Sequence, residues 1–174
     1  RLFLANSWEW PFPARASPIV REQLQVKIPV EDIHKMVMET EFDPQETLYL
    51  ALGTMYGFRR AELASITRQC YDGETLIVPT VKGGAVRRHT VPESLVEYLE
   101  ALPEGPSSSG QVRLLLQSCA AKANVSLPKG AGWHAVRRTQ ISELTLLVPT
   151  AALVKFFGWR SGPGKSCAAA SSAD

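Results

Sequence analysis

Five residues, spread over about a hundred positions of the chain, have the chemical types needed to hold a single phosphate group. They are Arg59, Lys82, His134, Arg137 and Trp159. Planar guanidinium groups arriving from two helices can each form paired hydrogen bonds with phosphate oxygens. An imidazole and an indole N–H can add hydrogen bonds, and an ammonium can protonate a departing oxygen. The set predicts transesterification at a phosphodiester, where charge grows on the two non-bridging oxygens.

The local spacing of these residues supports a shared site. Arg59 lies in the string Gly-Phe-Arg-Arg-Ala-Glu-Leu, in which Glu62 follows three residues later and can pair with it. His134 and Arg137 are also three residues apart, so a helix would carry both on one face. Each pattern alone has a simpler explanation as a surface ion pair, a chance pairing or a packed aromatic side chain. Their order and context together favour one site.

Helices are expected on both sides of these residues, from apolar periodicity and helix-start signals. The first begins after Pro29, with Ile33, Met36 and Val37 on its apolar face. The second opens at Asp43-Pro44, an N-cap followed by proline at the first helical position. A short helix then carries Arg59 and Glu62, and further helices are expected at about 92–102, 111–124, 134–147 and 150–159.

Two strands are expected at 74–79 and 86–91, where the helical period gives way to β-branched residues. Gly83 and Gly84 between them supply the positive φ that a tight turn needs, so Lys82 should project from the tip of a hairpin. The sequence therefore predicts a mainly α fold with a small antiparallel β-sheet, of the α+β class.

The chain is long enough for one domain with a substantial core, since it has 174 residues of which 45% are hydrophobic. Prolines interrupt residues 1–30, which we interpret as an N-terminal arm or interdomain linker. Residues 31–160 form the expected catalytic domain. Residues 161–174 read as a flexible low-complexity tail, and a non-native origin is one interpretation of it.

In their order and context, these residues resemble the catalytic domain of tyrosine recombinases, the integrase family that breaks and rejoins DNA through a 3′-phosphotyrosyl intermediate. The resemblance covers roughly residues 30–160 and implies the tyrosine recombinase catalytic-domain fold. It implies that Lys82 is the hairpin lysine of the family and that Glu62 is the acidic residue supporting the first arginine. Trp159 takes a position where most members have His and some have Trp. The resemblance also implies a function in site-specific DNA recombination. The implied partners are double-stranded DNA and other protomers of the same protein in a DNA-bound tetramer.

The sequence departs from the family's pattern at the nucleophile. The family's tyrosine follows shortly after the Gly-His or Gly-Trp element, which here corresponds to about Cys167 to Ala170. That stretch reads Cys-Ala-Ala-Ala, and all four tyrosines precede His134. We therefore expect the chain as given to be inactive in covalent chemistry. A truncated or replaced C-terminus is favoured over a naturally inactive homologue.

Basic residues gather around the proposed site, although the net charge of the chain is only +2. Residues 129–165 contain six bases and one acid, whereas residues 31–46 contain six acids and one base. One face is therefore predicted to be basic and to bind duplex DNA through its phosphates. The arginines expected to contribute are Arg60, Arg87, Arg88, Arg138 and Arg160.

Several classes of protein and site are disfavoured. Three cysteines without metal-ligand spacing predict neither a disulfide framework nor a metal site, and they favour a reducing, intracellular location. That location would be the cytoplasm and nucleoid, or the nucleus of a host cell. No apolar run approaches the roughly 20 residues that a membrane span needs. No cofactor is expected, because the protein itself supplies the cations.

Three alternative functions stay open at this point. The nearest is a catalytically inactive DNA-binding module derived from a tyrosine recombinase, which the missing tyrosine favours. A type IB topoisomerase-like enzyme would share related chemistry but act on one duplex. A phosphoesterase with His134 as nucleophile is disfavoured, because neither His34 nor His89 has a comparable context.

Overall fold

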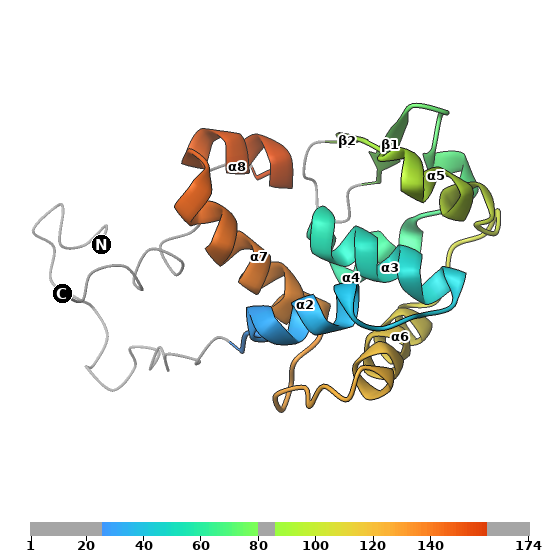
Figure 1. Cartoon of the computed structure of the whole chain (residues 1–174). Helices are drawn as coiled ribbons and strands as arrows, with labels where there is room; N and C mark the ends of the chain where they lie inside the picture. Colours follow the sequence, from blue (N-terminus) through green and yellow to red (C-terminus); the bar gives the residue numbers. More distant parts are fainter. Residues whose placement is uncertain (1–25, 80–85, 160–174) are drawn as a thin grey trace, which may run out of the picture.

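The structure is a computed structural model that describes residues 26–79 and 86–159 (Figure 1). These residues form a mostly helical domain with a two-stranded antiparallel sheet, as the sequence predicts. The elements are α2 (Val30–Met38), α3 (Pro44–Met55), α4 (Arg60–Ser65), the 3₁₀ turn η2 (Arg68–Cys70), β1 (Thr75–Val78), β2 (Arg87–Thr90), α5 (Glu93–Glu100), α6 (Ser109–Lys122), α7 (Trp133–Leu147) and α8 (Thr150–Phe157). No helix in this described part of the chain is long and apolar enough to cross a membrane.

The helix starts follow the capping signals in the sequence. At α3, Glu46 N–H donates to Asp43 Oδ1 at 2.9 Å, and Pro44 occupies the first turn. At α6, Gln111 N–H donates to Ser108 Oγ at 3.1 Å. This cap starts α6 at Ser109, two residues before the predicted start at Gln111.

The predicted apolar face of α2 is partly wrong. Met36 is 1% exposed, as expected for a core residue, but Val37 is 42% exposed. Consecutive helical residues lie about 100° apart, so a short helix at the surface cannot bury both. Ile33 is half-buried and packs against the core.

The core is centred on α3, which is in contact with α2, α4, α5, α6 and α7. Trp133, the first residue of α7, is 2% exposed, and its Nε1–H donates to the carbonyl oxygen of Val112 on α6 at 2.7 Å. Gly53 on α3 lies directly under this indole, because a Cβ there would be 2.2 Å from Trp133 Cζ3. Trp133 therefore joins α3, α6 and α7 and fixes the start of α7.

The segment before α2 also packs against α7. Ile28 is fully buried, and Thr139 Oγ1 donates to its carbonyl oxygen at 2.6 Å. The packing of this domain therefore begins before Val30.

The two strands pair with Thr75 opposite Thr90 and Val78 opposite Arg87. Along β2, side chains alternate between buried and exposed, so Arg87 and His89 point inward while Arg88 and Thr90 point outward. The inner face of this strand thus carries two ionisable side chains. Residues 80–85 between the strands, where the sequence predicts a hairpin turn with Lys82 at its tip, lie outside the described residues.

Candidate phosphate-binding site

Three elements bring three guanidinium groups around one carboxylate. Arg59 is the N-cap of α4, Arg87 lies on β2, and Arg137 lies on α7, while Glu62 belongs to α4 itself. Arg59 Nη1 donates to Glu62 Oε1 at 2.7 Å. Arg87 Nη2 is 2.7 Å from Glu62 Oε2, as an ion pair without the alignment of a hydrogen bond. We call these four residues the arginine cluster.

Glu62 is the centre of the arginine cluster. Its side chain is 2% exposed, and its Oε2 also accepts the backbone N–H of Arg59 at 2.8 Å. Burial alone raises the pKa of Glu62, but the backbone hydrogen bond from Arg59 and the charges of Arg87 and Arg59 lower it below its usual value. The carboxylate is therefore ionised at neutral pH.

Arg137 is buried, and only part of its guanidinium group has a hydrogen-bond partner. Its Nη1–H donates to the carbonyl oxygen of Gly57, and its guanidinium carbon lies 4.5 Å from the ring centroid of Phe157. Its Nη2 is also buried but has no hydrogen-bond partner among the described residues. An unpaired buried donor is costly, so this nitrogen is a candidate donor to an oxygen of a bound ligand.

The cluster holds more positive than negative charge. Burial, and after it the positive charge of Arg59, lowers the pKa of the Arg137 guanidinium, and Arg87 acts in the same direction. Glu62 offsets these effects only in part, because one carboxylate serves three guanidinium groups. An anion with several acceptor oxygens would relieve both the repulsion and the unpaired N–H group.

His134 is the second residue of α7 and is exposed. Desolvation lowers its pKa, and the positive charges of Arg138 and Arg59 lower it further. The imidazole is therefore neutral at neutral pH, with one nitrogen able to donate a hydrogen bond and the other able to accept a proton.

Trp159 is separated from the end of α8 by one residue, Gly158. Gly158 ends this helix with a left-handed φ of +64°, a conformation that glycine adopts without strain. The Trp159 ring stacks on Phe157 with centroids 5.0 Å apart, and Phe157 in turn lies against Arg137. The structure therefore connects Trp159 to the arginine cluster through one aromatic side chain.

The arginines that the sequence predicts to contact DNA differ in how far their side chains are exposed. Arg60 is exposed on α4, and Arg138 is half-buried on α7. The Arg88 side chain is 65% exposed and lies 3.6 Å from Asp72 Oδ2. Arg87 is different, because its side chain is 4% exposed and is paired with Glu62. Lys82 and Arg160 lie outside the described residues.

Sequence reasoning missed the burial of Arg87 and of its neighbour His89. The ring of His89 lies among Tyr56, Phe58 and Phe156, with centroid distances of 4.9, 5.5 and 5.0 Å. The available signal was the period of two along a strand, which places residues 87 and 89 on one face. That period alone cannot say which face is the inner one.

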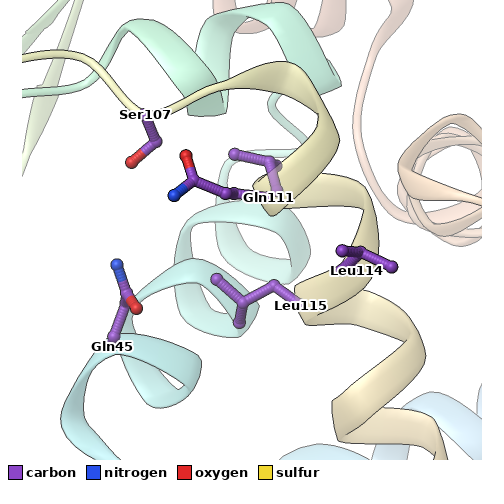
Figure 2. Close-up of a pocket in the computed structure, with 6 residues that line it drawn as sticks. Gln45, Ser107, Gln111, Leu114 and Leu115 are labelled. Carbon is purple, nitrogen blue, oxygen red and sulfur yellow. The ribbon is translucent and has the colours of Figure 1, made fainter.

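A pocket of about 230 Å³ lies between α3 and α6 (Figure 2). None of the residues that line it belongs to the arginine cluster. Gln45 enters the pocket from α3, and Gln111 and Leu115 enter from α6. The lining also includes Ser107, Val112 and Leu114, and it contains no charged side chain. This composition does not suit a phosphate. Within the described residues there is also no group of His, Cys, Asp or Glu side chains arranged to hold a metal ion.

Comparison with known proteins gives a consistent result for the fold. No protein-family model and no curated protein sequence matches the chain. Among solved structures, the chain is similar to XerA recombinase, with a TM-score of 0.65 at 14% identity over 91% of this chain and 63% of that one. It is similar to the catalytic domain of bacteriophage HP1 integrase, with a TM-score of 0.59 at 18% identity over 79% of this chain and 83% of that one.

A third similar structure is a lambda integrase dimer bound to a COC′ core site, with a TM-score of 0.64 at 15% identity over 88% of this chain and 62% of that one. The chain thus spans less than two thirds of the XerA and lambda integrase chains. These likenesses show that the described domain has the tyrosine recombinase catalytic-domain fold.

Proposed function

We propose that this domain acts in site-specific DNA recombination, with the arginine cluster holding the phosphate at which a strand is broken and rejoined through a 3′-phosphotyrosyl intermediate. The observation that carries the proposal is the buried Nη2 of Arg137, which lacks a partner in the described residues beside an excess of positive charge. Duplex DNA would supply the missing acceptor. Further protomers, up to a tetramer on DNA, are part of the proposal, and the dimeric lambda integrase structure supports assembly in general.

In this proposal Arg59 and Arg137 hold the two non-bridging oxygens from different helices. Neutral His134, at the N-terminal turn of α7, accepts a proton or donates a hydrogen bond at the same phosphate. Trp159 donates a further hydrogen bond through its indole N–H. Lys82, outside the described residues, would protonate the departing 5′ oxygen, since a flexible ammonium suits a general acid. The cations come from the protein, so the proposal includes no metal or cofactor.

DNA binding without strand cleavage is the second candidate function. The sequence has no tyrosine after Tyr98, so the residue that attacks the phosphate in the proposed reaction is not visible in it. A domain that keeps the arginine cluster but lacks the nucleophile would bind DNA and leave it intact. The two candidates share their binding chemistry and differ in the covalent step.

The Arg137→Ala variant tests the binding chemistry. It should weaken binding to any short duplex by tenfold or more, since hydrogen bonds to charged groups contribute roughly 1.5–3 kcal/mol. The slope of log affinity against log salt should fall by about 0.9, the value for one lost phosphate contact. Fluorescence anisotropy between about 50 and 200 mM salt measures both quantities.

The matched control for this prediction is Arg113→Ala, which removes an exposed arginine of α6. It should keep the wild-type slope. Circular dichroism checks that Arg137→Ala is folded, because Arg137 is buried. Wild-type binding that does not depend on salt would contradict the proposed function.

This chain should form no covalent bond to DNA. Tyr49, Tyr56 and Tyr71 are each at most 6% exposed. Each of their phenolic oxygens is 2.8 Å from a hydrogen-bond partner within the domain. The fourth tyrosine, Tyr98, is half-buried against the core on α5, a helix that contributes no residue to the arginine cluster. Incubation with a nicked suicide substrate should therefore give no denaturation-resistant protein–DNA band. A band that persists in the Cys167→Ala variant would show that one of the upstream tyrosines is the nucleophile.

A further inference from the structure

Arg87 has a position that none of the proposed chemical roles explains. It is an arginine with a 4% exposed side chain, held on the inner face of a strand. Its Nη2 is 2.7 Å from Glu62 Oε2, and its guanidinium carbon lies 5.2 Å from the ring centroid of Phe58. The guanidinium is therefore held between the Glu62 carboxylate and the Phe58 ring, while its Nη1 is buried without a hydrogen-bond partner among the described residues.

The stem of Arg87 also contacts the turn that leads to Trp159. A Cβ built on Gly158 would lie 2.8 Å from Arg87 Cδ and 3.0 Å from its Cγ. Gly158 therefore has no side chain at the point where Arg87 crosses the end of α8. Through these contacts, one side chain touches both the α4 part of the arginine cluster and the residue before Trp159.

The two carboxylate oxygens of Glu62 have different partners. Oε1 accepts a hydrogen bond from Arg59 Nη1–H at 2.7 Å. Oε2 accepts a hydrogen bond from the backbone N–H of Arg59 at 2.8 Å and forms the ion pair with Arg87 Nη2. Arg87 thus holds Oε2 on the inner side and turns Oε1 toward the Arg59 side chain. Arg59 itself is half-buried, with a 40% exposed side chain, and its guanidinium depends on this contact for its position.

We propose that Arg87 is a positioning residue of the phosphate-binding site. It fixes the Glu62 carboxylate, and through it the Arg59 guanidinium, and it supports the turn before Trp159. The inference rests on the proposed function, since it concerns the same site. It replaces the sequence-based interpretation of Arg87 as a surface contact to DNA, which the burial of the side chain does not favour.

A double-mutant cycle on duplex DNA binding tests this role. The variants are Arg59→Ala, Arg87→Met and the double variant, in which methionine keeps apolar volume beneath Gly158. If Arg87 acts through Arg59, each single variant should lose roughly tenfold in affinity and about 0.9 in salt slope, and the double variant should lose no more. If Arg87 bound phosphate directly, the double variant would lose about 1.8 in slope and roughly a hundredfold in affinity, which overturns the proposal.

Arg88→Met is the comparison variant, because Arg88 lies next to Arg87 on the outer face of β2. Its effect on binding should add to that of Arg59→Ala, whereas the effect of Arg87→Met should not. A lower unfolding midpoint for Arg87→Met with an unchanged salt slope would show a purely structural role and would also overturn the proposal. If Arg87→Met does not fold, Arg87→Lys retains the buried charge and the same cycle is run with it.

A measurement without DNA separates this inference from the proposed function. In ¹⁵N NMR spectra of side-chain guanidinium groups, Arg59 should rotate slowly about its Nε–Cζ bond in the wild type and rapidly in Arg87→Met. Unchanged slow rotation would mean that Arg87 does not position Arg59. If the wild type failed to bind DNA, the proposed function would fail, and this NMR result would still decide the role of Arg87.

Discussion

The Glu62→Gln variant should lower the free energy of unfolding by about 3–5 kcal/mol, the range for removing one partner from a buried ion pair. Glu62 is 2% exposed and is the carboxylate that Arg59 and Arg87 share. Glutamine keeps the shape of the side chain but removes the negative charge. Buried Arg87 and Arg137 then repel each other and Arg59 without compensation, so most of the loss is electrostatic.

Urea unfolding followed by circular dichroism measures this loss. Glu100→Gln is the matched control, since it breaks an exposed pair in which Arg68 Nη2 is 3.8 Å from Glu100 Oε1. Surface pairs contribute about 0–1 kcal/mol, so the control should stay close to the wild type. The double variant Glu62→Gln with Arg87→Met removes an unpaired charge and should recover part of the stability. If Glu62→Gln were as stable as the control, charge would not hold the cluster together.

The sequence was most informative where a local signal decides the structure. Asp43 and Pro44 predict the start of α3 because a cap and a proline act within one turn, and the structure confirms that start. The strands were predicted for the same reason, from the change of hydrophobic period around a Gly-Gly turn. Both predictions needed only residues that are close in the chain.

The arrangement of the candidate site depends on contacts between residues that are far apart in the sequence. The pairing of Arg59 with Glu62 is local, and the sequence indicated it. That Arg87 reaches the same carboxylate depends on which face of β2 packs inward, and the packing of α4 and α8 decides this. Charge alone favours an exposed arginine, since arginine is almost never buried unless it is paired. The sequence therefore indicated the local pairing of Arg59 with Glu62 but not the buried position of Arg87.

The domain should lose stability as the pH falls from about 6.5 to about 4, and His89 should cause much of that loss. Its pKa is lowered to about 4, first by burial and then by the charge of Arg87, while Glu62 acts in the opposite direction. The ring is surrounded by aromatic side chains, and its Nε2 has no partner among the described residues. In the unfolded chain a histidine titrates near 6.5.

The sign of the effect follows from proton binding. Between these two pKa values the unfolded chain binds a proton at His89 and the folded protein does not, so protonation favours unfolding. The contribution of His89 is complete above about pH 6.5 and is lost as the pH falls toward 4. A difference of this size corresponds to about 3 kcal/mol of stability.

The His89→Phe variant tests the assignment, because phenylalanine suits the aromatic surroundings and does not titrate. Urea midpoints measured from pH 7 to pH 4 should fall much less steeply in this variant than in the wild type, whatever its absolute stability at pH 7. His134 is the other histidine with a lowered pKa among the described residues, so His134→Gln is the control that retains His89. It should keep most of the wild-type slope, because His134 is exposed and solvent compensates its charge. The opposite result, in which His134→Gln removes the dependence of stability on pH and His89→Phe keeps it, would contradict the assignment. It would mean that the imidazole of His89 has a hydrogen-bond partner in solution. Strand β2 would then be less tightly packed against α8 than the contact of His89 with Phe156 indicates.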